Sequence, residues 1–158
     1  MEDLSLKEIY KRGHKLLKKC DYEGAKQYLE YGSNQGDLEC MFLYSRMLFQ
    51  GEGIQVDKAR SIELLKAAAD KGHVKSIIVY AKKLINGDFI ECNQNEGLDY
   101  LMKAAELGSK EAFFQIGELS YMKPDTRHNA SFFYKRAADL GHVDSMFLYA
   151  RMVQRWRK

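Results

Sequence analysis

Proline is almost absent from this sequence: Pro124 is the single one in 158 residues. Proline interrupts helices, and domains rich in β-strands use it with glycine in their many turns. The lack of proline therefore favours an all-helical fold over a β-sandwich. Long hydrophobic runs are missing as well, since no stretch approaches the roughly 18 apolar residues that a membrane-crossing helix requires. We expect a helical domain without a transmembrane segment.

Paired cysteines are also lacking. Cys20, Cys40 and Cys92 are odd in number and show no Cys-x-x-Cys spacing, which is typical of a reducing compartment. We expect these cysteines to be small packing residues and not reactive thiols. The residues from Met1 to Ser5 lack the basic and apolar segments of a signal peptide. The sequence therefore predicts a cytoplasmic, intracellular location.

Charge of one sign does not dominate the sequence. The formal net charge is +3, with 30% charged and 46% hydrophobic residues, as in ordinary foldable domains. Basic residues gather at both ends, from Lys7 to Lys19 and from Arg151 to Lys158. Attachment to nucleic acid or an anionic membrane through these ends is the weakest alternative, because acidic residues are interspersed. We expect neither of them as a partner.

An internal repeat is the main feature that the sequence does have. Three segments share an alanine pair followed by a glycine, and a weaker copy precedes them. The closing glycines, Gly36, Gly72, Gly108 and Gly141, lie 36, 36 and 33 residues apart. Such a period indicates units that stack on one another. The predicted repeats cover approximately 4–36, 37–72, 73–108 and 109–141, with a terminal helix over 142–158, all in a single domain, 1–158.

Each repeat is predicted to fold as two helices, A and B. Helix A follows a closing glycine and carries apolar residues at helical spacing, such as Ile77, Tyr80 and Leu84. Helix B begins at residues that cap helix amino termini. These residues are Asp21, Asp57, Asn93 and Thr126. The closing glycine ends helix B, because glycine adopts the left-handed conformation without steric strain.

Small residues recur where the two helices of a repeat should touch. In the A helices they are Gly13, Ser45, Ala81, Gly117 and Ala150. In the B helices they are Ala25, Ser61, Gly97 and Ala130. Small side chains let helix axes approach to about 8 Å. Because one hairpin cannot bury its own apolar face, we expect the hairpins to pack on one another.

These repeats resemble the Sel1-like repeat family, which is close to the tetratricopeptide repeats. The resemblance rests on Gly51-Glu52-Gly53-Ile54 with Asp57, and on the segments 67–72, 103–108 and 136–141. The fourth repeat departs from the pattern, with Tyr121-Met122-Lys123-Pro124 in place of the glycine loop. The resemblance implies an all-α fold, a right-handed α/α superhelix of about four hairpins plus a C-terminal helix. It also implies a non-enzymatic adaptor that binds a peptide or protein on its concave face.

Motifs for catalysis, metals and cofactors are weak. Gly51-Glu52-Gly53 lacks the third glycine and the Gly-Lys-Ser/Thr of phosphate loops, so we interpret it as a structural loop. The histidines show no metal-binding spacing, and His73 and His142 are expected to assist the start of the next helix. We expect no catalytic residue, metal or cofactor. A hydrolase or transferase site assembled by the fold, for example around His14, stays an alternative.

The repeat register also predicts partner-binding positions on the A helices. An apolar row comprises Tyr10, Phe42, Ile78, Phe114 and Phe147. A polar, mainly cationic row comprises His14, Arg46, Lys82, Glu118 and Arg151. Residues four apart share a helix face, so both rows should line one groove suited to a peptide with apolar and acidic residues. Aromatic side chains at helical spacing are equally consistent with core positions, and a charged row with a solvated face.

The terminal helix has no helix B after it. An apolar stripe runs along it, made of Met146, Tyr149, Met152, Val153 and Trp156. We favour packing of this stripe on the fourth hairpin as a cap. Its outer side would alternatively serve a partner or self-association through the C-terminal helix.

Overall fold

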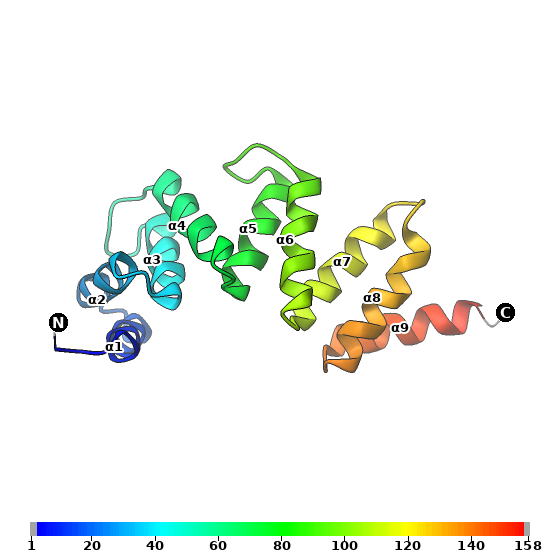
Figure 1. The fold of residues 1–158 in the computed structure, drawn as a ribbon, viewed down its shortest axis with the longest axis horizontal. Helices are drawn as coiled ribbons and strands as arrows, with labels where there is room; N and C mark the ends of the chain where they lie inside the picture. The colour runs from blue at the N-terminus through cyan, green and yellow to red at the C-terminus, as the bar shows by residue number, and fades with distance from the viewer. Residues whose placement is uncertain (1–2, 157–158) are drawn as a thin grey trace. The chain divides into compact units, whose positions relative to one another are not determined.

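The computed structural model describes residues 3–156, and the side chains of residues 3–154. Within these residues all regular secondary structure is helical, and this confirms the all-α fold class (Figure 1). The helices are α1 (Leu6–Lys18), α2 (Tyr22–Asn34), α3 (Leu38–Gln50), α4 (Lys58–Asp70), α5 (Val74–Asn86), α6 (Gln94–Glu106), α7 (Lys110–Met122), the 3₁₀ turn η1 (Arg127–Asn129), α8 (Ala130–Asp139) and α9 (Val143–Trp156). No described helix is long and apolar enough to span a membrane.

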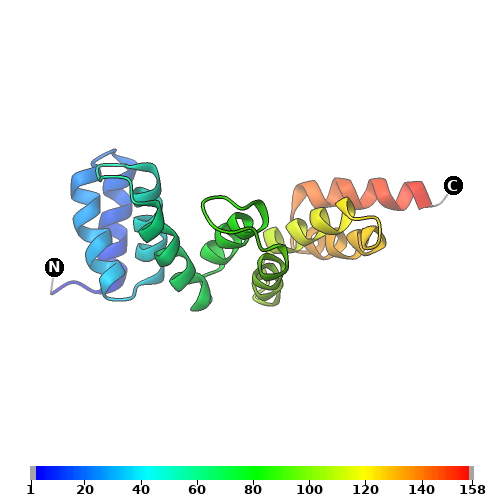
Figure 2. The ribbon, with the colours of Figure 1, turned by 90° about the horizontal axis from the view of Figure 1, so that it is seen from above.

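The helices form two compact units, Met1–Tyr80 and Ala81–Lys158. In the first unit, α1 packs on α2, α2 on α3, and α3 on α4 (Figure 2). In the second unit, α6 packs on α7, α7 on α8, and α8 on α9. The helix bounds place one pair of α-helices in each predicted repeat, while a single domain over 1–158 stays a prediction.

Side-chain caps start three of the four B helices where the sequence predicts them. The backbone N–H groups of Gly24, Arg60 and Glu96 donate to the capping side chains at 2.9–3.1 Å. The acceptors are Asp21, Asp57 and Asn93. These contacts satisfy amide groups that have no partner within the first turn of a helix.

Thr126 does not start the fourth helix B, so that prediction was wrong. Its Oγ1 donates a hydrogen bond to the Ser120 carbonyl at 3.1 Å, and it accepts none from the turn that follows. The loop brings Thr126 beside the last turn of α7. The Ser120 carbonyl has no partner within that helix, and the Thr126 hydroxyl supplies one. The chain then passes through η1, and α8 begins only at Ala130.

The closing glycines end the B helices as predicted. Their φ angles lie between +82° and +87°, a region that disfavours residues with a Cβ atom. The residue after each glycine donates its amide hydrogen to a carbonyl five residues earlier, as in His73 to Ala68 at 3.0 Å and His142 to Ala137 at 2.9 Å. This bonding closes the carboxyl ends of the helices and sets the direction in which the next helix A starts.

Small residues allow close contact within the hairpins. The Ser61 hydroxyl donates to the Ser45 carbonyl at 2.6 Å across α3 and α4. A Cβ atom on Gly97 would lie 2.6 Å from Ile85 Cγ1 and 3.0 Å from the Ala81 carbonyl oxygen, so α6 approaches α5 through a position that only glycine fits. On α9 the small residue Ala150, which is equivalent to Ser45 and Ala81 of the other A helices, is exposed.

The cysteines differ from one another in their surroundings. Cys40 is fully buried and lies against Gly32, as expected of a packing residue, and burial raises the pKa of its thiol. Cys20 and Cys92 are exposed in the turns after α1 and α5, so the packing prediction was wrong for them. The chain needs a left-handed turn at Cys20, where φ is +58°.

Candidate functional site

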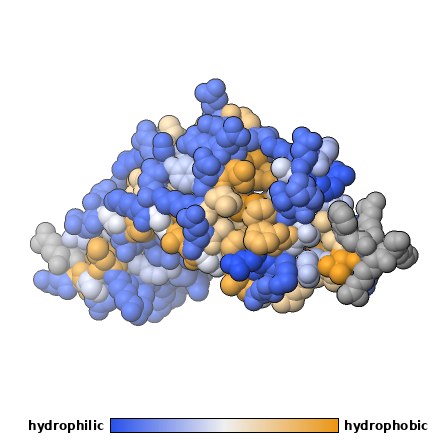
Figure 3. Space-filling model, turned by 45° about the vertical axis from the view of Figure 1, so that its right-hand side comes forward, coloured by the Kyte–Doolittle hydropathy of each residue, from blue (hydrophilic) through white to orange (hydrophobic). Residues whose placement is uncertain are grey.

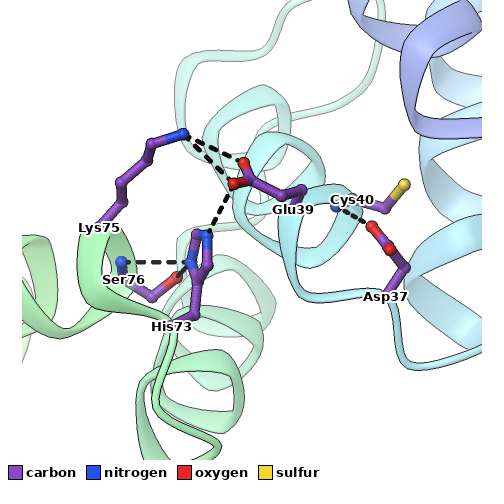
Figure 4. Close-up of polar contacts among 6 residues, drawn as sticks. All are labelled: Asp37, Glu39, Cys40, His73, Lys75 and Ser76. Carbon is purple, nitrogen blue, oxygen red and sulfur yellow. Dashed lines mark hydrogen bonds and ion pairs between the residues drawn. The ribbon is translucent and has the colours of Figure 1, made fainter. Parts of the chain in front are cut away.

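A histidine links two successive A helices in the first unit. His73 Nδ1 accepts a hydrogen bond from the Ser76 amide at 3.4 Å, so the ring caps α5 (Figure 4). Its Nε2 lies 3.5 Å from Glu39 of α3, and its ring packs on Phe42 with centroids 5.4 Å apart. Lys75 Nζ binds the same Glu39 carboxylate at 3.2 Å. His73 therefore assists the start of a helix, as predicted, and also connects that helix to the previous repeat.

The second unit repeats this arrangement around His142. Its Nδ1 accepts from the Ser145 amide at 3.3 Å, and its Nε2 lies 3.4 Å from Glu111 of α7. Its ring stacks on Phe114 at 4.5 Å. Lys82 of α5 binds the other oxygen of Glu111 at 3.6 Å. The Glu111 carboxylate thus joins residues from three A helices.

Both carboxylates are stabilised in their ionised form. Burial alone would raise the pKa of Glu39, but hydrogen bonds and the charges of Lys75 and His73 outweigh it and lower the pKa. Burial would also raise the pKa of Glu111, but a hydrogen bond from Gln115 and the charges of Lys82 and His142 lower it.

The side chains of the predicted apolar row differ in their exposure, and Tyr10 and Phe42 pack against the core of the first unit. Phe42 and Phe114 are half-buried against the capping histidines, and Tyr10 stacks on His14 with centroids 5.5 Å apart. Ile78 is also half-buried, whereas Phe147 is 65% exposed. Of this row, Phe42 and Phe114 therefore stand at junctions between successive A helices.

Members of the polar row have different surroundings. Arg46, Lys82 and Arg151 are exposed, as we expected of charged residues. Lys82 is held by Glu111, whereas Arg46 and Arg151 form no ion pair with any other described residue. Arg46 belongs to the first unit and Arg151 to the second. One groove that joins both rows over their whole length stays a prediction.

A pocket of about 660 Å³ lies in the second unit between α7, α8 and α9. Its walls are formed by Glu118, Tyr121, Arg127, Tyr134, Leu148, Arg151 and Met152. This volume falls in the range of about 300–1,000 Å³ that is usual for ligand sites. Another pocket in this unit, beside α6, holds only about 90 Å³. The larger pocket is therefore our candidate binding site.

A buried tyrosine fixes the acidic side of the pocket. The Tyr134 hydroxyl donates a hydrogen bond to Glu118, and the tyrosine side chain is almost fully buried. Burial, and then the Glu118 charge, raise the pKa of Tyr134, so the phenol remains a donor at neutral pH. A carboxylate can accept about four hydrogen bonds, so Glu118 keeps acceptor capacity for a bound molecule.

Two arginines supply the positive side of the pocket. Arg127 Nε donates to the Tyr121 carbonyl at 3.0 Å, and its guanidinium lies 5.3 Å from the Tyr121 ring centroid. Arg151 extends from α9 and is exposed. Among the side chains that the structure describes, no ion pair joins Glu118 to either arginine. Opposite charges therefore line one pocket without neutralising each other by direct contact.

Sequence reasoning found two of the residues that line this pocket, Glu118 and Arg151. It missed Tyr121, Arg127, Tyr134, Leu148 and Met152 as site residues. One signal was available, because Tyr134 stands seven residues before its closing glycine, where the other repeats have leucine. A phenol at a core position requires a hydrogen-bond partner.

The terminal helix packs on α8, as expected of a cap. Tyr149, Met152 and Val153 of its stripe are half-buried, but Met146 is 48% exposed. The side chain of Trp156 lies outside the described residues.

Of the exposed large hydrophobic side chains in the described part of the chain, only Leu6 and Val56 lie in the first unit. Figure 3 shows one face of the molecule, on which hydrophobic side chains form a patch among hydrophilic ones. Self-association through α9 stays a prediction.

A metal site is not evident in residues 3–154, where no group of three or more His, Cys, Asp or Glu side chains could hold an ion. The loop over Gly51 and Gly53 serves the backbone. Gly51 ends α3 at φ +77°, and a Cβ atom on Gly53 would lie 2.4 Å from Tyr22 Cβ. The glycines of this loop therefore have structural reasons for being there.

Comparison with known proteins agrees with this architecture. The sequence profile of the Sel1 repeat matches residues 1–37, 38–73, 84–109 and 113–142. A Sel1 repeat protein from Oxalobacter formigenes has a TM-score of 0.86 and 17% identity over 93% of this chain and 63% of its own. The protein c5321, described as a protective antigen present in uropathogenic Escherichia coli strains, displays an SLR fold with a TM-score of 0.83. Its identity is 17% over 98% of this chain and 35% of its own. No curated protein sequence matches the chain.

The chain belongs to the Sel1 repeat family, because the matched repeats cover most of its length. Proteins of this family are generally protein–protein interaction modules and are typically not enzymes. The chain spans 63% and 35% of the two solved proteins, so the resemblance to them establishes the fold alone.

Proposed function

We propose that this chain is a non-enzymatic adaptor that binds a peptide segment of another protein in the pocket between α7, α8 and α9. One observation supports this site above all: a pocket of ligand-sized volume combines an apolar wall, two aromatic residues and unpaired charges. Aromatic and arginine side chains in pockets are frequent anchors of protein interfaces. The apolar wall, Leu148 and Met152, supplies contact area for an anchoring side chain.

Selection from a random peptide library displayed on phage tests the proposal. The pocket variant is Met152→Arg, which places a long charged side chain against the apolar wall. Its matched control is Met146→Arg on the same helix, where the side chain is exposed and does not line the pocket. Circular dichroism confirms that both variants keep their helices. We expect selected peptides to bind the wild type and Met146→Arg with equal affinity, and Met152→Arg at least tenfold more weakly, as for loss of an anchor contact worth about 1.4 kcal/mol.

Two results would contradict this proposal. If the library yields no peptide enriched on the wild type over Met152→Arg, the pocket is not a peptide site. If the selected peptides bind both arginine variants equally, the contact surface lies elsewhere on the chain. Reproducible turnover in a broad activity screen, abolished by one substitution, would instead favour the enzymatic alternative.

A further inference from the structure

The charges inside the pocket distinguish between the peptides that could enter it. Two guanidinium groups, on Arg127 and Arg151, face one carboxylate, on Glu118. Arg127 donates a hydrogen bond to the Tyr121 backbone carbonyl, and its guanidinium group lies over the Tyr121 ring. No carboxylate of the described residues forms an ion pair with it. Arg151 likewise has no acidic partner among these residues. The pocket therefore has an excess of positive charge for a ligand to neutralise.

Glu118 limits how that charge can be neutralised. The hydrogen bond from the buried Tyr134 holds its carboxylate in place at the pocket wall. A second carboxylate placed beside it would be repelled, because like charges that lie close together and are partly shielded from water repel each other strongly. A peptide N–H group or a basic side chain would be accepted there instead.

The remaining wall favours an apolar group. Leu148 and Met152 are four residues apart and half-buried on one face of α9, and Leu148 also lies three residues before Arg151. An apolar side chain that contacts them lies next to the guanidinium group that binds the acid. Burial of an aliphatic or aromatic side chain in such a place removes apolar surface from water and so favours binding.

We infer that the pocket selects a peptide segment in which a single aspartate or glutamate adjoins an apolar residue. The side-chain carboxylate binds Arg127 and Arg151, the apolar side chain contacts Leu148 and Met152, and Glu118 excludes a second acidic residue. This inference rests on the proposed function and adds the chemistry of the partner. Other occupants of the same pocket, such as a basic segment held by Glu118, are outcomes of the test below.

The test uses fluorescein-labelled synthetic copies of the peptides that the library yields, titrated by fluorescence anisotropy. Replacing the acidic residue by its amide should weaken binding to the wild type about tenfold, as expected for loss of a charge-assisted hydrogen bond. The same replacement should have little effect on Arg127→Ala/Arg151→Ala, in which the carboxylate has no partner. Raising the salt from about 0.05 to about 0.5 M should weaken binding to the wild type and not to the double variant.

Arg46→Ala is the matched control, because Arg46 is an exposed arginine of the first unit without an ion pair. We expect it to bind every peptide as the wild type does. Glu118→Gln should bind peptides with two adjacent acidic residues more tightly than the wild type, by several fold. Amidating the carboxyl terminus of the peptide should change nothing, since a side-chain carboxylate is the ligand.

The outcomes separate this inference from the function on which it rests. Peptides that bind the pocket without a preference for acidic residues would overturn the inference and leave the proposed function intact. So would a preference for acids that survives in the double arginine variant, or one that disappears when the carboxyl terminus is amidated. Failure to select any peptide that depends on Met152 would contradict the proposed function itself.

Discussion

Tyr44 offers a direct test of how the first unit is held together. Its ring is 1% exposed, and its hydroxyl donates to Glu30 Oε1 of α2 at 2.8 Å. The Arg60 side chain of α4 lies 3.9 Å from the same oxygen, and its guanidinium carbon lies 5.8 Å from the centroid of the Tyr44 ring. Three helices therefore meet at one phenol. Replacing Tyr44 by phenylalanine removes the hydroxyl and keeps the ring.

The expected cost follows from the surroundings of the bond. A hydrogen bond to a charged acceptor contributes about 1.5–3 kcal/mol to stability. The Glu30 side chain is 36% exposed, so water can solvate its carboxylate in the variant and reduce this loss. The void left by one oxygen atom adds little. We expect Tyr44→Phe to lower the free energy of unfolding by about 1–2 kcal/mol at neutral pH.

The same bond predicts how this difference depends on pH. Burial and then Glu30 raise the pKa of Tyr44 from 10.0 to about 12. Because the folded pKa is above the unfolded one, the native state keeps a proton that the unfolded chain releases. The contribution of the phenol is therefore complete below pH 10 and is lost as the pH rises toward 12.

Urea unfolding followed by circular dichroism, at pH near 7.5 and near 11, measures both effects. The other tyrosines are the same in both proteins, so the difference between wild type and Tyr44→Phe isolates this one. The difference should shrink toward zero at the higher pH. A difference that is the same at both pH values would refute the role assigned to the phenol, and no difference at either pH would refute the bond.

Two further predictions concern packing and charge. Gly97→Val should lower the free energy of unfolding by about 2–3 kcal/mol, because its Cβ would press on Ile85 and on the Ala81 carbonyl. Gly24→Ala, whose Cβ would displace only the exposed Asp21 carboxylate that caps α2, should cost about 1 kcal/mol or less in the same urea titration, and equal costs would contradict the packing argument. Glu39→Gln should cost under about 1 kcal/mol at neutral pH, since the carboxylate is partly exposed. The pKa of Glu39 in the folded state lies below 4.5, so its contribution to stability is lost as the pH falls below that value. The free energy of unfolding of Glu39→Gln should therefore fall less steeply with acid than that of the wild type.

The sequence predicts those features of the fold that depend on local backbone chemistry. Glycine is favoured where the backbone adopts the left-handed conformation after a helix. Gly72 and Gly108 adopt it, with φ angles of +87° and +83°. A short polar side chain is required where helix B begins after the longer loops, as at Asp57. Thr126 failed the same reasoning because its hydroxyl donates to the Ser120 carbonyl of α7, and the chain passes through η1 before α8 begins at Ala130.

Contacts between repeats were harder to predict, because they depend on pairs of residues far apart in the sequence. The sequence is equally consistent with Phe42 in a groove or in the core, and in the structure this side chain packs against the core of the first unit and contacts His73 of the next repeat. The helical period places Phe42 on a face but does not say what covers that face. The recurrence of a histidine after a closing glycine, with a serine three residues later, was the available signal for this junction.

The candidate pocket shows the limit of reasoning from a repeat register. The register gives residues at equivalent positions of the repeats the same predicted role. It therefore puts Glu118 and Arg151 in one polar row shared by all A helices. The pocket depends instead on departures of the fourth repeat from the others. A tyrosine replaces the core leucine and orients Glu118, and the shortened loop brings Arg127 of η1 to the edge of the pocket. Stacking conserves the common positions because they carry the buried contacts, so a specific ligand site is best sought where one repeat breaks the pattern.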